Sequence, residues 1–549
     1  MSTPATPSHY VGEVTDCLPT PRHLGRRVRH TPSVDVESGS TADAVELEAG
    51  GSAPAVAGRV VRDRRTWAVI GLACGMSVLV RLPMLSSPVS VDEGGYLAIA
   101  RGWAHGQVLY RDVFVDRPQG LLALFRVWDW LSGGNTRSIH LMAMLFGIVL
   151  VVSTAVVVRE VAGDTAARLA AMVCAVVSAA PMLEGFAANT ELLSGALSAA
   201  GLAVGVVGWS KRRPLRWFFT AGLCSGLALS LKQSGFDGLA ALLGWLLLVA
   251  VFGTRARATA LKAIAAAIAG LTAVLTVLVV HGALTGWSRW WAAVAGYRLR
   301  TQSAFASADW HNLAATMPYA FIVLGTVALT AVLGAESAAQ NLTTRLTTAD
   351  PGPLILLFWL IVAIIAFLLG GGFWRHYWLL LAAPLSALAG IGLAKVPKFR
   401  YLAMATVLAP SLISAGWVYS TDRAHLNIRA AADHHAAVDE QVAKWFDSHR
   451  QPGQNLYVLC ASAGAYADAH QDPGYPYLWF VEVHHAPHAQ NLLVAYLNDT
   501  INGPHYIAEY ERASTCDSSG RVEQILNNSF TQVALIGSIP IFERNPSPP

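Results

Sequence analysis

Apolar runs of about 20 residues recur along most of this chain, and they constrain its fold more than any other feature. A helix of that length crosses the ~30 Å hydrocarbon layer of a bilayer. Of the 549 residues, 54% are hydrophobic and only 13% are charged, whereas about a quarter of a soluble domain is charged. We therefore predict an α-helical polytopic membrane protein with about eleven spans. The expected spans are residues 67–85, 139–158, 169–186, 191–209, 217–233, 236–252, 261–282, 317–335, 353–371, 376–394 and 400–418.

The charges of the connecting segments predict how these spans are oriented. Arg and Lys gather before the first span and then in every second connection, and the positive-inside rule assigns such segments to the cytoplasm. These residues are Arg59, Arg62, Arg64, Arg65, Arg159, Arg168, Lys211, Arg212, Arg213, Arg216, Arg255, Arg257, Lys262, Arg345, Lys395, Lys398 and Arg400. An odd number of spans then predicts a multi-pass protein of the plasma membrane with a cytoplasmic N-terminus and residues 420–549 outside the cytoplasm.

Composition divides the chain into three parts. Residues 1–62 are rich in Pro, Ser, Thr, Ala and Gly and lack an apolar period, so we expect a disordered cytoplasmic tail. Residues 63–419 form the membrane domain, with long outside loops at 86–138 and 283–316. Residues 420–549 predict a small α/β domain outside the cytoplasm. Its expected helices are Ala436–His449 and Val522–Asn527, and its expected strands are Leu456–Ala461, Tyr506–Tyr510 and Val533–Phe542.

Several function classes have no support in the sequence. The six cysteines show no metal-ligand spacing, and no P-loop, Gly-rich nucleotide fingerprint or HExxH motif occurs. No cofactor is therefore predicted, and a divalent metal has no support. The net charge of +4 is small for this length and does not indicate nucleic-acid binding. Cys460 and Cys516 fall in the C-terminal domain, where they could form a disulfide or remain two free thiols.

The first outside loop carries the densest set of polar residues. Asp92 and Glu93 follow the first span directly, and Gly94 and Gly95 are expected to let the backbone turn sharply. The loop continues with Tyr96, Trp103, Tyr110, Asp112, Asp116, Arg117, Pro118 and Gly120. An ordinary solvated loop is the alternative, but acidic residues at a membrane boundary are costly unless they are solvated or paired.

More charged residues lie at the outer ends expected for other spans. They are Glu184, Glu191, Lys232, Arg298, Arg300, Arg375 and His376. A carboxylate base beside an acceptor hydroxyl, opposite cations that hold a phosphate, is what transfer of a phosphate-linked group requires. Each residue could instead be a structural pair or a snorkelling side chain. Arg298 and Arg300 suit that alternative best, because basic interfacial loops also bind lipid headgroups.

These motifs resemble those of the GT-C superfamily of membrane glycosyltransferases. The resemblance is carried by Asp92-Glu93, Tyr110-Arg111-Asp112, Asp116-Arg117-Pro118-Gln119-Gly120, Leu231-Lys232-Gln233 and the late span Arg375–Gly392. The pattern is similar to bacterial relatives of dolichyl-phosphate-mannose–protein mannosyltransferases and of lipid A aminoarabinose transferases. Gln119 departs from the usual Pro–Pro pair, so no subfamily is assigned.

The resemblance implies an inverting glycosyltransferase of GT-C-like fold. Its donor would be a sugar, mannose or an arabinose-like pentose, on a polyprenyl phosphate, and its acceptor an extracytoplasmic glycan, lipid or protein. The implied catalytic residues are Asp92 and Glu93. The implied acceptor or sugar contacts are Tyr96, Tyr110, Asp112, Asp116 and Glu191, and the implied donor-phosphate contacts are Lys232, Arg298, Arg300, Arg375 and His376. On this interpretation the acids gather in the first loop and the cations gather elsewhere.

Two other classes fit part of the pattern. A membrane transporter or lipid flippase with an accessory domain would also be polytopic, but transporters tend to show internal repeats, and none is visible here. A non-catalytic scaffold or sensor leaves the acidic first loop unexplained. The aromatic segment Tyr475–Phe480 could serve binding or pack the core of its domain. A single outward-facing cavity shared by Asp92 and Lys232 would favour the transferase, whereas a cavity at the membrane midplane would favour transport.

Overall fold

The computed structural model describes residues 53–211, 213–253, 256–340, 352, 354–420, 436–460 and 463–546, without the side chains of 53–62 and 301–308. The predicted tail up to residue 52, Arg212, Arg255 and Arg345 lie outside the described residues. Residues 57–549 form one compact unit, and every contact below lies within it.

Every predicted span overlaps a helix in the structure. The helices are α1 (Ala53–Arg81), α4 (Ile139–Ala162), α5 (Asp164–Val177), α6 (Thr190–Trp209), α7 (Pro214–Leu231), α8 (Asp237–Phe252), α9 (Arg257–Trp291), α10 (Tyr297–Ala339), α12 (Leu354–Gly370), η5 with α13 (Arg375–Leu381, Ala382–Ala394) and α14 (Arg400–Tyr419). Among the described residues, seven helical segments are long and apolar enough to cross a membrane, and α8 and α12 are shorter apolar helices.

Two predicted boundaries are wrong. The third span was expected to reach residue 186, but α5 ends at Val177, and a 3₁₀ turn, η3 (Pro181–Leu183), follows. Pro181 cannot donate a helical hydrogen bond, which accounts for the early stop. Residues 283–316 were expected to be a loop, but α9 runs on to Trp291 and a π-helical turn, η4 (Ala292–Gly296), leads directly into α10.

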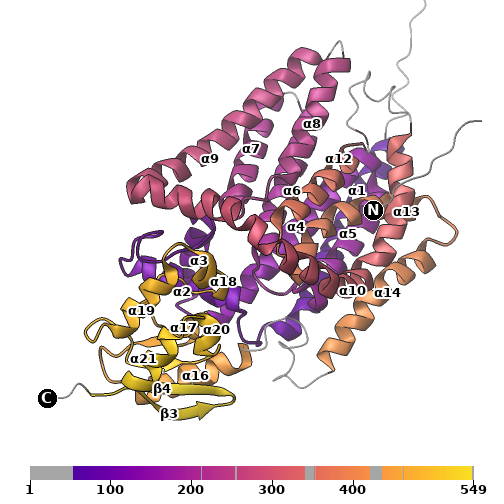
Figure 1. Ribbon diagram of the computed structural model, residues 1–549. Coiled ribbons are helices and arrows are strands. Elements are labelled where there is room, and N and C mark those ends of the chain that lie inside the picture. The colour runs from indigo at the N-terminus through magenta and orange to yellow at the C-terminus, as the bar shows by residue number, and fades with distance from the viewer. Residues whose placement is uncertain are drawn as a thin grey trace, which may run out of the picture. The chain divides into compact units, whose positions relative to one another are not determined.

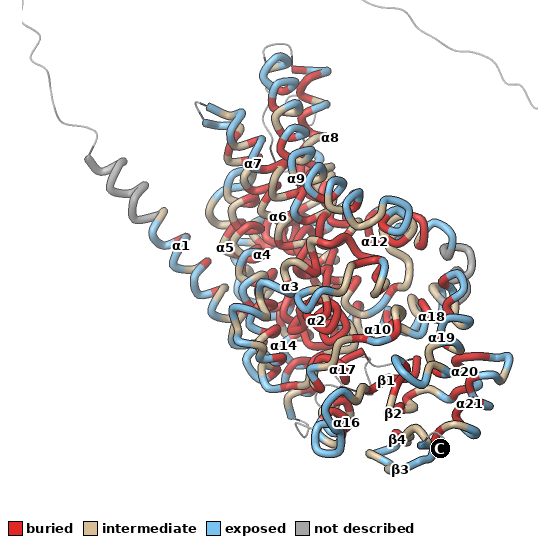
Figure 2. The backbone as a smooth tube through the Cα atoms, turned by 90° about the vertical axis from the view of Figure 1, so that its left-hand side faces the viewer, coloured by how far each residue is buried: buried red, intermediate tan, exposed pale blue. Residues whose placement is uncertain are grey.

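The segment predicted as the first outside loop contains two helices, α2 (Val91–Ala104) and α3 (Gln119–Leu131). Ser90 caps α2 with a capping box, in which its side chain accepts from the Glu93 backbone N–H and Glu93 accepts from the Ser90 backbone N–H. Gly94 and Gly95 therefore lie within a helix, and the sharp turn predicted for them is wrong. Figure 2 shows α2 as one of the most deeply buried helices of the structure.

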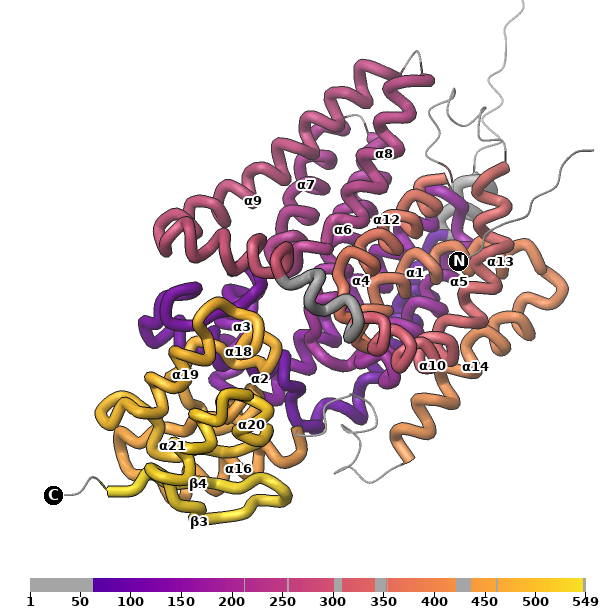
Figure 3. Tube along the Cα trace, in the orientation of Figure 1, coloured from indigo at the N-terminus to yellow at the C-terminus, as the bar shows by residue number. Residues whose placement is uncertain are grey.

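Close packing among the membrane helices positions the ends of the spans. α4 packs against α5 and α6, α7 lies between α6 and α9, and α13 contacts α5 and α10. Figures 1 and 3 show α9 running alongside α7. Arg159 at the end of α4 pairs with Asp63 in α1 and with Asp164 at the start of α5. One basic connection therefore lies beside the start of α1, as the loop-charge pattern predicts.

The C-terminal domain has a four-stranded mixed sheet with helices around it. Strands β1 (Leu456–Val458) and β2 (Tyr506–Ala508) are parallel, and β4 (Ile539–Arg544) pairs antiparallel with β2 and with β3 (Phe530–Ile536). The strand predicted over Val533–Phe542 is instead a hairpin, because Gly537 has φ 59° and turns the chain. The helices are α16 (Ala436–His449), α17 (Gly464–Asp468), α18 (Phe480–His485), α19 (Ala489–Asn498), α20 (Ala513–Cys516) and α21 (Arg521–Ser529).

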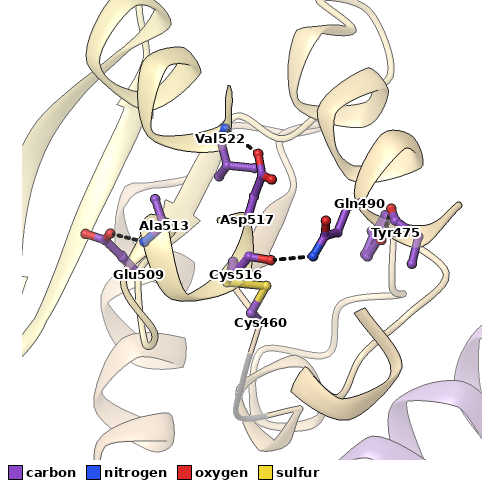
Figure 4. The surroundings of a disulfide bond; sticks show 9 residues. Cys460, Tyr475, Gln490, Glu509, Ala513, Cys516, Asp517 and Val522 are labelled. Carbon is purple, nitrogen blue, oxygen red and sulfur yellow. Dashed lines mark hydrogen bonds between the residues drawn. A yellow bond between two sulfur atoms is a disulfide. The ribbon is translucent and has the colours of Figure 1, made fainter. Parts of the chain in front are cut away.

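A disulfide joins two parts of this domain. Cys460, after β1, is bonded to Cys516 at the end of α20, with Cα atoms 6.0 Å apart (Figure 4). The Gln490 amide donates to the Cys516 carbonyl and links α19 to the same point. Of the two alternatives that the sequence left open for these thiols, the structure has the disulfide.

Candidate active site

The first turn of α2 directs its two acids to different sides of the helix. Successive helical residues are rotated by about 100°, so Asp92 and Glu93 cannot face the same space. Glu93 is 1% exposed and accepts from the backbone N–H groups of Ser90 and Ala188, at 3.0 and 2.6 Å. His140 lies 3.4 Å from the same carboxylate. Glu93 therefore anchors α2 to the chain before α6, which differs from its predicted role beside the base.

The pKa of Glu93 agrees with this anchoring. Burial alone would raise it, but His140 and the two backbone donors outweigh burial, and the pKa lies below its ordinary value. Glu93 is therefore ionised in the folded protein, with its negative charge stabilised by these donors. A carboxylate in this state is a poor proton acceptor for a substrate.

Asp92 faces a different environment and is partly exposed. Its Oδ1 accepts from the indole Nε1 of Trp479, 3.1 Å away in the C-terminal domain. Burial raises the pKa of Asp92, and Glu191 and Glu184 raise it further, while the positive charges of His376 and Arg117 oppose them. Asp92 therefore shares one electrostatic environment with residues from four other segments of the chain.

A network of two acids and two bases lies at the start of α6. The Lys232 ammonium pairs with Glu191, and His376 Nδ1 lies 2.7 Å from Glu184 Oε2. His376 Nε2 is 3.8 Å from Glu191, which joins the two pairs. The Lys232 Nζ also lies 3.9 Å from the centre of the Tyr377 ring. The residues expected from the ends of three different spans therefore meet, and Glu191 is their common partner.

A buried arginine holds the segment that carries Glu184. Arg81 at the end of α1 donates from Nε to the Gly185 carbonyl and from Nη2 to the Ser178 carbonyl, both at 2.7 Å. Glu184 itself has φ 56°, a left-handed conformation that is rare outside glycine. The end of the first span thus holds the chain in the position from which Glu184 reaches His376.

A second charged cluster is centred on Asp116. Arg117 Nη1 and Arg298 Nε each lie 2.5 Å from one of its oxygens. Burial would raise the pKa of Asp116, but these two guanidinium groups lower it to about 2. The Gln233 amide, next to Lys232, donates to the Asp116 carbonyl at 2.8 Å and so connects this cluster to the first.

Gln119 has a structural role in this loop. Its Oε1 accepts from the Trp290 indole at 2.9 Å, and its Nε2 donates to the Leu278 carbonyl at 2.6 Å. Tyr110 donates to the Arg117 carbonyl at 3.0 Å, and thereby holds the loop that carries Asp116. A proline at position 119 could make neither side-chain contact. The glutamine that replaces the second proline of the usual Pro–Pro pair therefore attaches the loop to α9.

Several residues expected in the site lie elsewhere or serve another purpose. Asp112 pairs with its neighbour Arg111 and accepts from the Val108 backbone at 2.8 Å, which closes its own turn. Arg300 is exposed and the Arg375 guanidinium stacks at 3.9 Å over the ring of Tyr319. The buried Tyr96 ring lies between Phe125 and Trp479.

The expected separation of acids from cations is wrong. Every cation of the two clusters lies beside a carboxylate, because a charge removed from water needs a partner of opposite sign. The acids are Asp92, Asp116, Glu184 and Glu191, and the basic residues are Arg117, Lys232, Arg298 and His376. These residues form one nearly charge-balanced site.

Four contributors were not assigned to the site from the sequence. Arg117 lies within a motif that the sequence does show, so its role could have been found there. Tyr377 directly follows His376. Trp479 comes from the aromatic segment of the C-terminal domain and Glu482 from α18, which follows it, and no local pattern indicates that they reach residues of the first loop. Among the described residues, no three or more His, Cys, Asp or Glu side chains are grouped to hold a metal.

An apolar groove lies apart from these charges, between α10 and α14. Its volume is about 740 Å³. Its lining residues are Met182, Ile322, Thr326, Thr406, Ala409, Pro410, Ile413, Ser414 and Trp417. Met182 lies two residues before Glu184, so the groove ends near the segment that carries that acid.

Comparison with known proteins identifies the class of fold. The chain superposes on the Archaeoglobus fulgidus oligosaccharyltransferase AglB, solved with an inhibitory peptide and a dolichol-phosphate, with a TM-score of 0.55, 12% identity and coverage of 87% of this chain and 74% of that one. It also superposes on ArnT from Cupriavidus metallidurans bound to undecaprenyl phosphate, with a TM-score of 0.53, 13% identity and coverage of 89% and 98%. The apo state of that ArnT gives a TM-score of 0.54 at 14% identity, with the same coverage.

The sequence comparisons match part of the chain to a known family. Residues 116–281 match the family of dolichyl-phosphate-mannose-protein mannosyltransferases, while no curated protein matches by sequence. The chain is a polytopic membrane protein with the fold of GT-C glycosyltransferases and a small α/β domain at its C-terminal end, which confirms the predicted fold class and the resemblance.

Proposed function

We propose that this membrane protein transfers a sugar from a polyprenyl-phosphate carrier to an acceptor hydroxyl, with inversion at the anomeric carbon. The observation that carries the proposal is the position of Asp92, a partly exposed carboxylate beside a buried, charge-balanced set of acids and cations. The match of residues 116–281 to a mannosyltransferase family supports it, and so does the likeness to solved proteins that hold dolichol-phosphate and undecaprenyl phosphate.

In the proposed reaction Asp92 is the general base. Its carboxylate takes the proton of the acceptor hydroxyl while that oxygen bonds to the anomeric carbon. The bond from the anomeric carbon to the phosphate oxygen breaks, and the polyprenyl phosphate leaves with the electron pair. Burial raises the pKa of Asp92, which makes it a stronger base than an exposed aspartate.

Cations beside Asp92 would stabilise the charge of the leaving phosphate. Lys232 and His376 are the proposed phosphate contacts, and Glu191 and Glu184 orient them. Arg117 and Arg298 are a second pair of cations, oriented by Asp116. Because fixed donors cost no reorganisation during the reaction, such preorganised pairs can stabilise a charge that develops in the transition state.

The apolar groove between α10 and α14 is a suitable place for the polyprenyl chain. Its lining is almost wholly apolar, and it reaches Met182, close in sequence to Glu184. An isoprenoid chain in this groove would remain in an apolar environment while its phosphate lay toward His376. The sugar, mannose or an arabinose-like pentose, and the acceptor, a glycan, lipid or protein, are matters for experiment.

We infer that the site and the C-terminal domain face away from the cytoplasm, and that the N-terminus lies within it. The loop charges support this orientation, and so does the Cys460–Cys516 disulfide, because disulfides persist in oxidising compartments. A reporter active only in the cytoplasm, fused after the C-terminal residue, should be silent. Activity of that reporter would reverse the topology.

The function is tested with purified protein and a panel of synthetic polyprenyl-phosphate sugars. Transfer of labelled mannose or pentose to an envelope extract is measured, with Asp92→Asn as the inactive control and Asp447→Asn, an exposed acid in α16, as the matched active one. We expect the wild type and Asp447→Asn to transfer sugar from at least one donor, and Asp92→Asn to show almost no transfer. Absence of transfer, together with movement of an intact lipid or solute across vesicles, would favour the transporter alternative.

A further inference from the structure

One face of α2 is shaped for close approach by the C-terminal domain. A Cβ at Gly94 would lie 2.4 Å from the Cα of Gly464 in α17, and a Cβ at Gly95 would lie 2.4 Å from the Trp479 ring. Real side-chain carbons do not approach other atoms this closely, so both positions require glycine. The absence of side chains at these two glycines therefore lets the C-terminal domain pack closely against α2.

Hydrogen bonds also join α2 and the loop after it to the C-terminal domain. The Arg101 Nη1 donates to the Ala467 carbonyl at 2.6 Å, and the Gln107 amide donates to the Pro473 carbonyl at 2.8 Å. Farther along the first loop, the Phe114 backbone N–H donates to the Pro476 carbonyl at 2.8 Å. These contacts fix the backbone just before Trp479, so the position of its indole is set by both domains.

Trp479 brings its only polar atom to Asp92. Its ring centre lies 5.6 Å from that of Tyr96, and its Nε1 donates to Asp92 Oδ1 at 3.1 Å. Indole is a hydrogen-bond donor and never an acceptor, so the contact favours the ionised carboxylate. The other charged groups that act on Asp92 are His376, Arg117, Glu191 and Glu184.

We propose that Trp479 of the C-terminal domain is a positioning residue for Asp92, so that the domain forms part of the active site. The indole holds one carboxylate oxygen and leaves the other for the acceptor hydroxyl. This inference rests on the proposed function, because it concerns the same base. It explains why the C-terminal domain is seated on the helix that carries Asp92.

The first test compares Trp479→Phe with the wild type in the transfer assay. Phenylalanine keeps an aromatic ring against Tyr96 and Gly95 but removes the N–H group. Loss of one hydrogen bond to a charged group changes a rate constant by about 10- to 100-fold. We therefore expect kcat to fall by about that factor, while KM for the donor changes by less than about 2-fold. Trp445→Phe, in α16 of the same domain, is the matched control and should retain wild-type rates.

The pH profile separates positioning from a merely structural effect. The N–H group favours ionised Asp92, so its removal raises the pKa of the base and moves the acidic limb of kcat/KM to higher pH. A variant that is only less well folded would have a lower kcat/KM at every pH, and the acidic limb of its pH profile would stay at the wild-type position. Trp479→His, which can restore an N–H donor, should recover part of the rate.

Gly95→Ala tests the same contact from the opposite side. Its methyl group would displace the Trp479 ring, so it should reproduce the lower kcat and the shifted profile with the indole still present. The double variant should be little worse than Trp479→Phe, because both changes act on one contact. Should Trp479→Phe fail to fold, Gly95→Ala gives the decisive result. Wild-type rates and pH profiles in the variants that fold would overturn the inference and leave the proposed function intact.

Discussion

The two sides of the first turn of α2 differ, although neighbouring residues supply their acids. On one side, Glu93 is enclosed and accepts from two backbone N–H groups near His140. On the other, Asp92 is partly exposed, holds one indole donor and lies among groups of both signs. Because a helix separates adjacent side chains, the two acids have different surroundings: Glu93 holds the backbone, and Asp92 is the base in the proposed reaction. The following predictions test that division.

The largest expected effect is that of Asp92→Asn on turnover. The change keeps the shape of the side chain and removes the proton acceptor, so turnover should fall by about 10²- to 10⁴-fold, the usual contribution of a positioned general base. Donor binding should change far less, because the cations that would hold the phosphate remain. Single-turnover transfer and equilibrium binding of a synthetic donor measure the two effects. Near-wild-type turnover would place the base elsewhere.

Glu93→Gln should affect stability more than chemistry. The amide is a weaker acceptor for the two backbone donors and for His140, so the free energy of unfolding should fall by about 1–3 kcal/mol. The folded pKa lies below the ordinary value, so this contribution is present above the unfolded pKa and is lost as pH falls through the folded pKa.

Thermal unfolding in detergent at two pH values checks this prediction. The difference between the wild type and Glu93→Gln should be larger at neutral pH than at acidic pH. The turnover of folded Glu93→Gln protein should stay within a few-fold of the wild type. A loss of turnover as large as that of Asp92→Asn would make Glu93 a chemical partner after all.

Glu482→Gln should have a smaller effect on stability than Glu93→Gln, and this effect should depend on pH in the opposite direction. Glu482 is buried, one of its oxygens has no hydrogen-bond partner, and burial followed by the charge of Asp116 raises its pKa well above the ordinary value, although Arg117 and Arg298 oppose the shift. The folded protein therefore binds a proton there that the unfolded chain releases, and stability falls as pH rises above the unfolded pKa.

Glutamine imitates the protonated acid and cannot ionise. The melting temperature of Glu482→Gln should therefore decline less than that of the wild type between about pH 5 and pH 8, because the unfolded pKa of Glu lies near 4.3. Transfer activity at neutral pH should be retained. Parallel declines in the two proteins would show that Glu482 is ionised in the folded state.

The smallest effect is expected for Asp112→Asn. Asp112 shares the first loop with Asp92 but holds its own turn and pairs with the neighbouring Arg111 at the surface. Water screens exposed pairs of this kind, so they contribute little to stability, and turnover should stay within about 2-fold of the wild type because Asp112 contacts none of the described residues around Asp92. The same transfer assay measures it. A loss comparable to that of Asp92→Asn would return Asp112 to the site.

The approximate positions of the membrane helices follow from the amino-acid sequence. In a bilayer every backbone polar group must be satisfied within its own segment, so an apolar run of sufficient length has one local solution, the helix. Each predicted span accordingly overlaps a helix, and in the C-terminal domain Ala436–His449 is a helix with the predicted bounds. Local turn chemistry was harder to predict, as the helix that stops before Pro181 and the hairpin at Gly537 show.

Which of the charged residues form the candidate site depends on contacts between distant parts of the chain. Asp92 and Trp479 are 387 positions apart, and Lys232 and Glu191 are 41 apart. A charged side chain takes its role from the partners that replace its water, and those partners come from other elements of the fold. The sequence therefore showed Asp92 and Glu93 as a like pair, and the structure separated them by what each one contacts.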